Sequence, residues 1–177
     1  MKSVKAKLIF VLIIVILLTA TLAGCAKTGT GNESADLTLE DLAEKLYENV
    51  DVPPYETIRL DSSNFEFFAF IPYDDSLSAV AADALVNITP HSMVIIRTGN
   101  GNGASLAKEV VSNADPNKWL CVGSEIVNVA YTDHYVLLIM SEKGIADDIT
   151  ENFKNLAKDL DGMEMTLLTA NNSRYEQ

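Results

Sequence analysis

The sequence is poor in cysteine and in basic residues. It contains two cysteines, Cys25 and Cys121, so at most one disulfide can form within the chain. Lys and Arg number 13 against 25 Asp and Glu, which gives a formal net charge of −12 at pH 7. A strongly negative chain repels the phosphates of nucleic acids and of anionic lipids. The composition therefore argues against a nucleic-acid partner and against electrostatic attachment to a membrane.

Long apolar runs are absent from the sequence except near its start. Three lysines, Lys2, Lys5 and Lys7, precede an apolar stretch at residues 8–23 that only two threonines interrupt. A basic start, an apolar run and small residues before a cleavage point are typical of a secretory signal. The run of 16 residues is shorter than the roughly 18 expected of a spanning helix, which favours a cleaved leader over an uncleaved anchor.

The apolar run ends in Leu22-Ala23-Gly24-Cys25, which resembles the lipobox of bacterial lipoproteins. The resemblance implies cleavage between Gly24 and Cys25 and a diacylglycerol on the Cys25 thiol. Two acyl chains give stable membrane anchoring. Residues 1–24 are then a signal peptide, and residues 25–36 form a lipidated, flexible tether. Loss of three lysines with the leader moves the net charge to −15, and the domain is expected on the outer face of the cytoplasmic membrane.

Residues 37–170 are expected to form a single α+β domain, followed by a polar tail at residues 171–177. Apolar residues at helical spacing predict helices at 39–50, 104–114 and 145–160. Apolar and β-branched runs predict strands at 55–60, 65–71, 93–97, 119–122, 126–131 and 134–140, with a further strand at 163–168. Residues 78–88 fit a helix by their alanines or a strand by their valines, and a strand is favoured. The simplest architecture for this order is a mostly antiparallel sheet with about three amphipathic helices packed on it.

The segment Lys118-Trp119-Leu120-Cys121-Val122-Gly123 and the helix start Ala146-Asp147 resemble a family of small clostridial lipoproteins of unknown function. The similarity extends over residues 37–160. It implies an extracytoplasmic lipoprotein of a Gram-positive bacterium, and it implies no catalytic residue.

A thiol, an imidazole and a carboxylate are present in the second half of the chain. Cys121 and His134 lie on strands that are expected to pair, and Asp133 precedes His134. Such a set is the minimum for a cysteine hydrolase. However, an apolar strand offers no cation or helix start to lower the thiol pKa, so a buried structural cysteine is favoured. His91 follows a proline and is expected to be solvated.

The sequence predicts neither a metal site nor a cofactor. The loop Gly99-Asn100-Gly101-Asn102-Gly103 has the place of an anion-binding turn but lacks the lysine of a phosphate loop. The acidic pairs at residues 74–75 and 147–148 lack the ligand spacing of a calcium loop.

Three aromatic residues, Phe68, Phe70 and Tyr73, form either a binding patch on an uncovered face or part of the core. With no convergent catalytic set, we predict a lipid-anchored, non-enzymatic module that binds an envelope protein, a peptide or a cell-wall component. A small hydrolase using Cys121 and His134 is the alternative, and a solute-binding accessory of a transporter is a third possibility.

Overall fold

The computed structural model describes residues 37–86 and 88–170. The predictions for the signal peptide, for Gly24 and Cys25, for the tether and for the tail at residues 171–177 lie outside the described residues. Within them, six strands form one sheet in the order β1-β2-β3-β5-β4-β6, with every neighbouring pair antiparallel. The strands are β1 (Tyr55–Leu60), β2 (Leu77–Ala84), β3 (Ser92–Thr98), β4 (Ile126–Tyr131), β5 (Tyr135–Ser141) and β6 (Thr166–Thr169).

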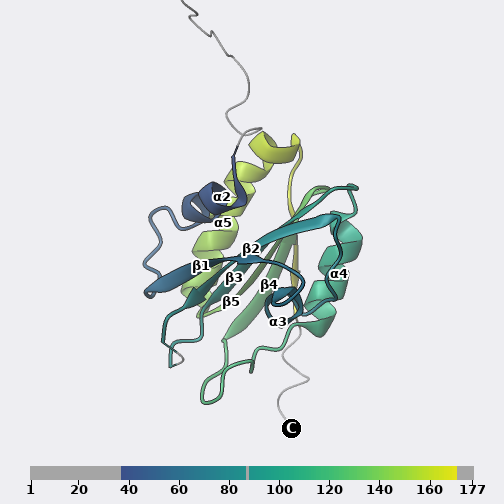
Figure 1. The fold of residues 1–177 in the computed structure, drawn as a ribbon. Coiled ribbons are helices and arrows are strands. Elements are labelled where there is room, and N and C mark those ends of the chain that lie inside the picture. The colour runs from purple at the N-terminus through teal and green to yellow at the C-terminus, as the bar shows by residue number, and fades with distance from the viewer. Residues whose placement is uncertain (1–36, 87, 171–177) are drawn as a thin grey trace, which may run out of the picture. The chain divides into compact units, whose positions relative to one another are not determined.

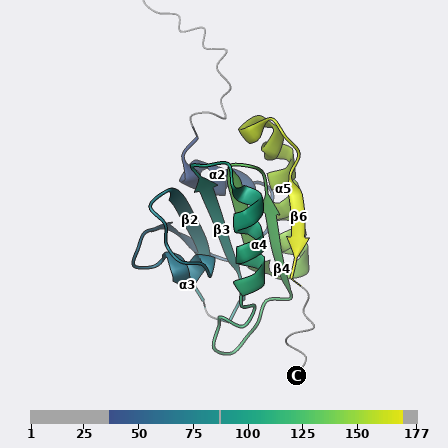
Figure 2. The ribbon, with the colours of Figure 1, turned by 90° about the vertical axis from the view of Figure 1, so that its right-hand side faces the viewer.

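Four helices cover the two faces of this sheet: α2 (Leu39–Leu46), α3 (Phe65–Ala69), α4 (Gly103–Asn113) and α5 (Lys143–Asp161). Figures 1 and 2 show α2 and α5 on one face and α3 and α4 on the other. The expected α+β domain with a mostly antiparallel sheet is therefore confirmed.

Both faces of the central strands are buried, which explains why these strands are apolar throughout. Successive side chains of a strand point to opposite faces. On β3, Val94 and Ile96 pack into the core below α3 and α4, while Met93 and Ile95 pack below α2 and α5. A sheet covered on both sides needs continuous apolar strands rather than alternating ones.

The start of α2 follows the capping pattern in the sequence. The Thr38 hydroxyl accepts a hydrogen bond from the Asp41 amide at 3.1 Å, and the Asp41 carboxylate accepts one from the Thr38 amide at 3.1 Å. Such a reciprocal capping box satisfies two amide groups that the first helical turn leaves without partners.

Two expected strands are wrong. Residues 65–69 form the short helix α3 because the preceding turn winds the chain: Asp61 accepts hydrogen bonds from Ser63, and the Asn64 side chain accepts one from the Asp61 amide. Phe70, with φ of 60°, ends that helix. Residues 119–122 belong to an irregular connection between α4 and β4.

Candidate functional site

Large apolar side chains are exposed at the end of the sheet where β2 finishes and β3 begins. We call this group the apolar tip: Phe67 (62% exposed), Leu85 (59%), Val86 (49%), Ile88 (73%) and Leu120 (95%). They come from α3, from the β2–β3 connection and from the α4–β4 connection. Figure 1 shows these three segments toward the lower end of the view.

Lys118 ties the three segments of the apolar tip together. Its Nζ donates hydrogen bonds to Asp83 on β2 and to the Ser92 hydroxyl on β3, both at 2.8 Å. The same ammonium lies 5.5 Å from the ring centroid of Phe67 and 5.0 Å from those of Phe68 and Trp119. Cations within about 6 Å of an aromatic face are attracted to it. The tip is therefore built on a buried cation.

The burial of Lys118 has an electrostatic cost that Asp83 offsets. Only 6% of the Lys118 side chain is exposed. Burial lowers the pKa of the ammonium, and the Asp83 carboxylate opposes that shift. A lysine beside a serine hydroxyl is also the arrangement of a Ser–Lys nucleophile pair. Here Ser92 is fully buried and Asp83 stabilises the charged lysine, so neither group is available for nucleophilic attack.

The expectation that His91 is solvated is wrong. His91 is fully buried, with Nε2 at 2.7 Å from the Tyr47 hydroxyl and Nδ1 at 2.9 Å from the Ser141 hydroxyl. Burial lowers the pKa of His91 to about 4. The imidazole is thus neutral at pH 7 and links α2, β3 and the end of β5.

The second histidine, His134, lies at the other end of β4 from the apolar tip and pairs with a different carboxylate from the one expected. His134 Nδ1 is 3.1 Å from Asp161 Oδ1, and the His134 amide donates to Asp161 Oδ2 at 2.8 Å. The Thr132 hydroxyl also donates to Asp161. The carboxylate at the end of α5 therefore holds the β4–β5 turn, and Asp133 contributes its backbone carbonyl instead, to Thr98 and Gly103.

Cys121 and His134 are not brought together. Cys121 is exposed in the connection that leads into β4, and His134 follows the end of β4, a six-residue strand about 20 Å long. The preferred interpretation of Cys121 as a buried structural cysteine is also wrong, because Cys121 is exposed in an irregular connection and does not belong to a strand. The pairing of thiol and imidazole that the hydrolase hypothesis needs is absent.

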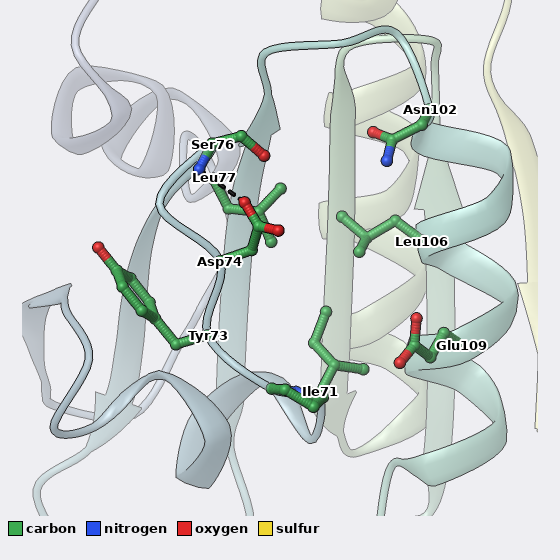
Figure 3. Close-up of a pocket in the computed structure, with 9 residues that line it drawn as sticks. Ile71, Tyr73, Asp74, Ser76, Leu77, Asn102, Leu106 and Glu109 are labelled. Carbon is green, nitrogen blue, oxygen red and sulfur yellow. Dashed lines mark hydrogen bonds between the residues drawn. The ribbon is translucent and has the colours of Figure 1, made fainter.

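A cleft with a volume of about 270 Å³ separates α4 from the segment between α3 and β2. Figure 3 shows Asp74 on one side of it and Leu106 and Glu109 of α4 on the other, whereas the ring of Tyr73 points away. Hydrogen bonds from the Ser76 hydroxyl and from the Ser76 amide, the latter at 2.7 Å, hold the pKa of Asp74 below its usual range.

The aromatic residues singled out from the sequence do not form one patch. Phe68 is buried in the core below α4, Phe70 is half-buried, and Tyr73 is 39% exposed with its ring edge-to-face on Phe65 at 5.7 Å. Phe67 is more exposed than any of these three residues, although strand geometry would have turned it inward. Phe68 is therefore part of the core, and its neighbour Phe67 lies on the surface.

The comparisons with known proteins found no relative of this chain. No family model, no curated protein and no solved structure matches this chain. The resemblance to clostridial lipoproteins stays a prediction. Over residues 37–86 and 88–170, no helix is both long and apolar enough to cross a membrane, and no group of three or more metal-ligating side chains is assembled.

One sequence signal points to the buried pair that was missed. Asp83 is the only charged residue in the otherwise small and apolar strand β2. A carboxylate in a buried strand needs a cation, because an unpaired buried charge is very costly. The position of that cation, 35 residues further along the chain at Lys118, is not visible in the sequence.

Proposed function

We propose that this chain is a lipid-anchored, extracytoplasmic binding domain that holds another envelope protein through its apolar tip. The observation that supports the proposal best is the exposure of Phe67, Leu85, Val86, Ile88 and Leu120 on neighbouring segments. Single exposed apolar residues are common, but a group of them at one place marks an interaction surface.

The chemistry of the tip favours a protein partner over a polysaccharide. Its exposed side chains are mostly aliphatic, and aliphatic groups offer sugar hydroxyls no hydrogen bonds in exchange for those lost to water. An apolar protein segment has no such hydrogen bonds to replace, and its burial against the tip is favourable in proportion to the apolar area removed from water.

The charged side chains around the apolar tip indicate the charge of the partner segment. Lys118, the basic residue beneath the tip, is already paired with Asp83, whereas Glu66 on α3 and Asp115 after α4 are exposed. The remainder of the chain is also strongly acidic. We therefore expect an apolar partner segment flanked by Lys or Arg, because opposite charges at the rim of an interface increase the association rate and exclude wrong partners.

The position of Leu37, the first described residue, favours a protein partner over the anchoring membrane as the occupant of the apolar tip. Leu37 accepts a hydrogen bond from the Arg97 side chain, near the last residues of β3, whereas the tip lies beside the first residues of β3. An anchor at Cys25 would therefore be joined to the end of the domain opposite the tip.

The proposed interaction is tested with charge-introducing variants. Leu85→Asp is expected to abolish capture of the partner from detergent-solubilised envelope, whereas the control Leu167→Asp is expected to preserve it, because Leu167 is an exposed leucine on β6. The captured protein is then purified, and its affinity for both variants is measured at low and high salt. A basic partner predicts binding that weakens with salt.

Other outcomes of this experiment contradict the proposal. Equal capture by Leu85→Asp and Leu167→Asp would place the interaction elsewhere. If light scattering detects a dimer that Leu85→Asp disrupts, the occupant of the tip is a second copy of this chain. If the chain sediments with vesicles and Leu85→Asp abolishes that sedimentation, the occupant is a lipid surface.

The anchor has its own test. Mass spectrometry of the N-terminal peptide should find residue 25 as the first residue and carrying a diacylglycerol, and Cys25→Ser should release the chain from the membrane fraction. An unmodified Cys25 with the leader still attached would contradict the lipoprotein assignment.

A further inference from the structure

We infer that the pocket around Lys118 is a binding site for an alkylammonium ion, and that the chain occupies this site with its own lysine side chain. The ammonium contacts one carboxylate and one hydroxyl at 2.8 Å, and three aromatic rings lie 5.0–5.5 Å away. A carboxylate combined with several aromatic faces is the usual recognition chemistry for an organic ammonium group.

Most of the pocket belongs to elements other than the one that carries Lys118. Phe67 and Phe68 stand edge-to-face on α3, with ring centroids 4.9 Å apart. Asp83 and Ser92 are register partners on β2 and β3. Phe68 is packed in the core, and neither strand is at an edge of the sheet. The pocket walls are therefore held by the fold, and removal of the Lys118 side chain should leave them in place.

The segment that brings in Lys118 is the irregular connection between α4 and β4. It places Lys118 inside the pocket and Leu120, two residues later, almost fully in solvent. Lys118 thus acts as an internal ligand that competes with any external ammonium group. If the proposed function holds, the natural competitor is a lysine of the basic partner; the site itself does not depend on that partner.

The inference is tested by removing the internal ligand and supplying its chemical equivalent. The n-butylammonium ion has the four carbons and the charge of a lysine side chain beyond Cα. In the full chain purified in non-ionic detergent, Lys118→Ala is expected to melt at a lower temperature than the unmodified chain. Millimolar n-butylammonium is expected to raise the melting temperature of Lys118→Ala in a saturable way, because a ligand that binds the native state stabilises it.

Three controls define the site. The unmodified chain should not respond to n-butylammonium, because Lys118 occupies the pocket. Neutral n-butanol should not stabilise Lys118→Ala. The double variant Lys118→Ala/Asp83→Asn should bind n-butylammonium about tenfold more weakly or worse, since a charge-assisted hydrogen bond is lost.

Each outcome decides the inference. A folded Lys118→Ala that does not respond, or that responds equally with and without Asp83, overturns it. If Lys118→Ala does not fold alone, refolding that depends on n-butylammonium supports the site, and failure to refold at any concentration of n-butylammonium overturns it. None of these readouts uses the partner, so failure here leaves the docking proposal standing, and the reverse is also true.

Discussion

At the scale of single residues, the buried imidazole of His91 is the most informative group. Its ring nitrogens contact two hydroxyls from elements far apart in the sequence, Tyr47 on one side and Ser141 on the other. Protonation would place a buried charge inside this network, which the Asp83 carboxylate favours and the Lys118 ammonium opposes. The pKa of His91 falls from 6.5 to about 4, chiefly because of burial.

The stability of the domain should therefore depend on pH through His91. Between pH 6.5 and 4 the unfolded state binds a proton that the native state does not, so stability is lost as the pH falls through this window. Between pH 7 and 4.5 we expect a loss of roughly 2 kcal/mol from this residue. Urea unfolding at the two pH values measures it. His91→Gln should show a correspondingly smaller difference, and an unchanged difference would contradict the assignment.

Lys118 and Asp83 form the second residue-scale prediction. Lys118→Met removes the cation and leaves the Asp83 carboxylate partly buried without it, which should cost about 3 kcal/mol of unfolding free energy. Lys118→Met/Asp83→Leu removes both charges and should be less destabilised than Lys118→Met alone. Urea unfolding of the two variants compares them. A double variant that is the less stable of the two would show that the pair is not the reason for the cost.

At the scale of elements, the structure separates what the sequence predicts well from what it does not. Continuous apolar runs such as residues 93–96 identify the central strands, and helix α5 follows from its apolar stripe, in which Ile149 and Phe153 are fully buried. Helix α2 begins at Leu39, as the apolar spacing from residue 39 onward predicts. These predictions succeed because local spacing and burial agree.

The errors occur where hydrogen bonds outside the apolar pattern, either in an adjacent turn or over a long range, decide the local structure. The aromatic run at residues 65–71 has the composition of a strand, but hydrogen bonds within the turn at residues 61–64 wind it into α3. The apolar segment after Lys118 resembles a strand, but Lys118 ties this segment to the end of the sheet and leaves Leu120 and Cys121 outside. Sequence spacing carries no information on the Lys118–Asp83 contact or the His134–Asp161 contact, which join residues 35 and 27 positions apart.

The helical assignment of residues 65–69 has a direct test. A strand with Phe65 inside would also bury Phe67 and expose Phe68, whereas α3 buries Phe68 and exposes Phe67. We therefore expect Phe68→Ala to cost about 3–5 kcal/mol of unfolding free energy and Phe67→Ala to cost less than about 1 kcal/mol. Urea unfolding measures both. The reverse order would restore the strand interpretation.

At the scale of the whole molecule, the proposed function depends on where the described chain begins relative to the apolar tip. The described chain begins at Leu37, beside the last residues of β3, and the apolar tip lies beside the first residues of the same strand. Figure 1 shows α2, where the described chain begins, at the opposite end of the view from the α4–β4 connection. The start of the described chain and the apolar tip therefore lie at opposite ends of the domain.

The most direct test of this account is photo-crosslinking from the apolar tip in intact cells. A photoreactive amino acid at Leu120 should form an adduct with one envelope protein, through a peptide that contains apolar and basic residues. The same amino acid at Glu44, which is exposed on α2 near Leu37, should not, and Leu85→Asp should abolish the Leu120 adduct. The same adduct from both positions, or none from Leu120, would contradict the claim that the tip binds the partner.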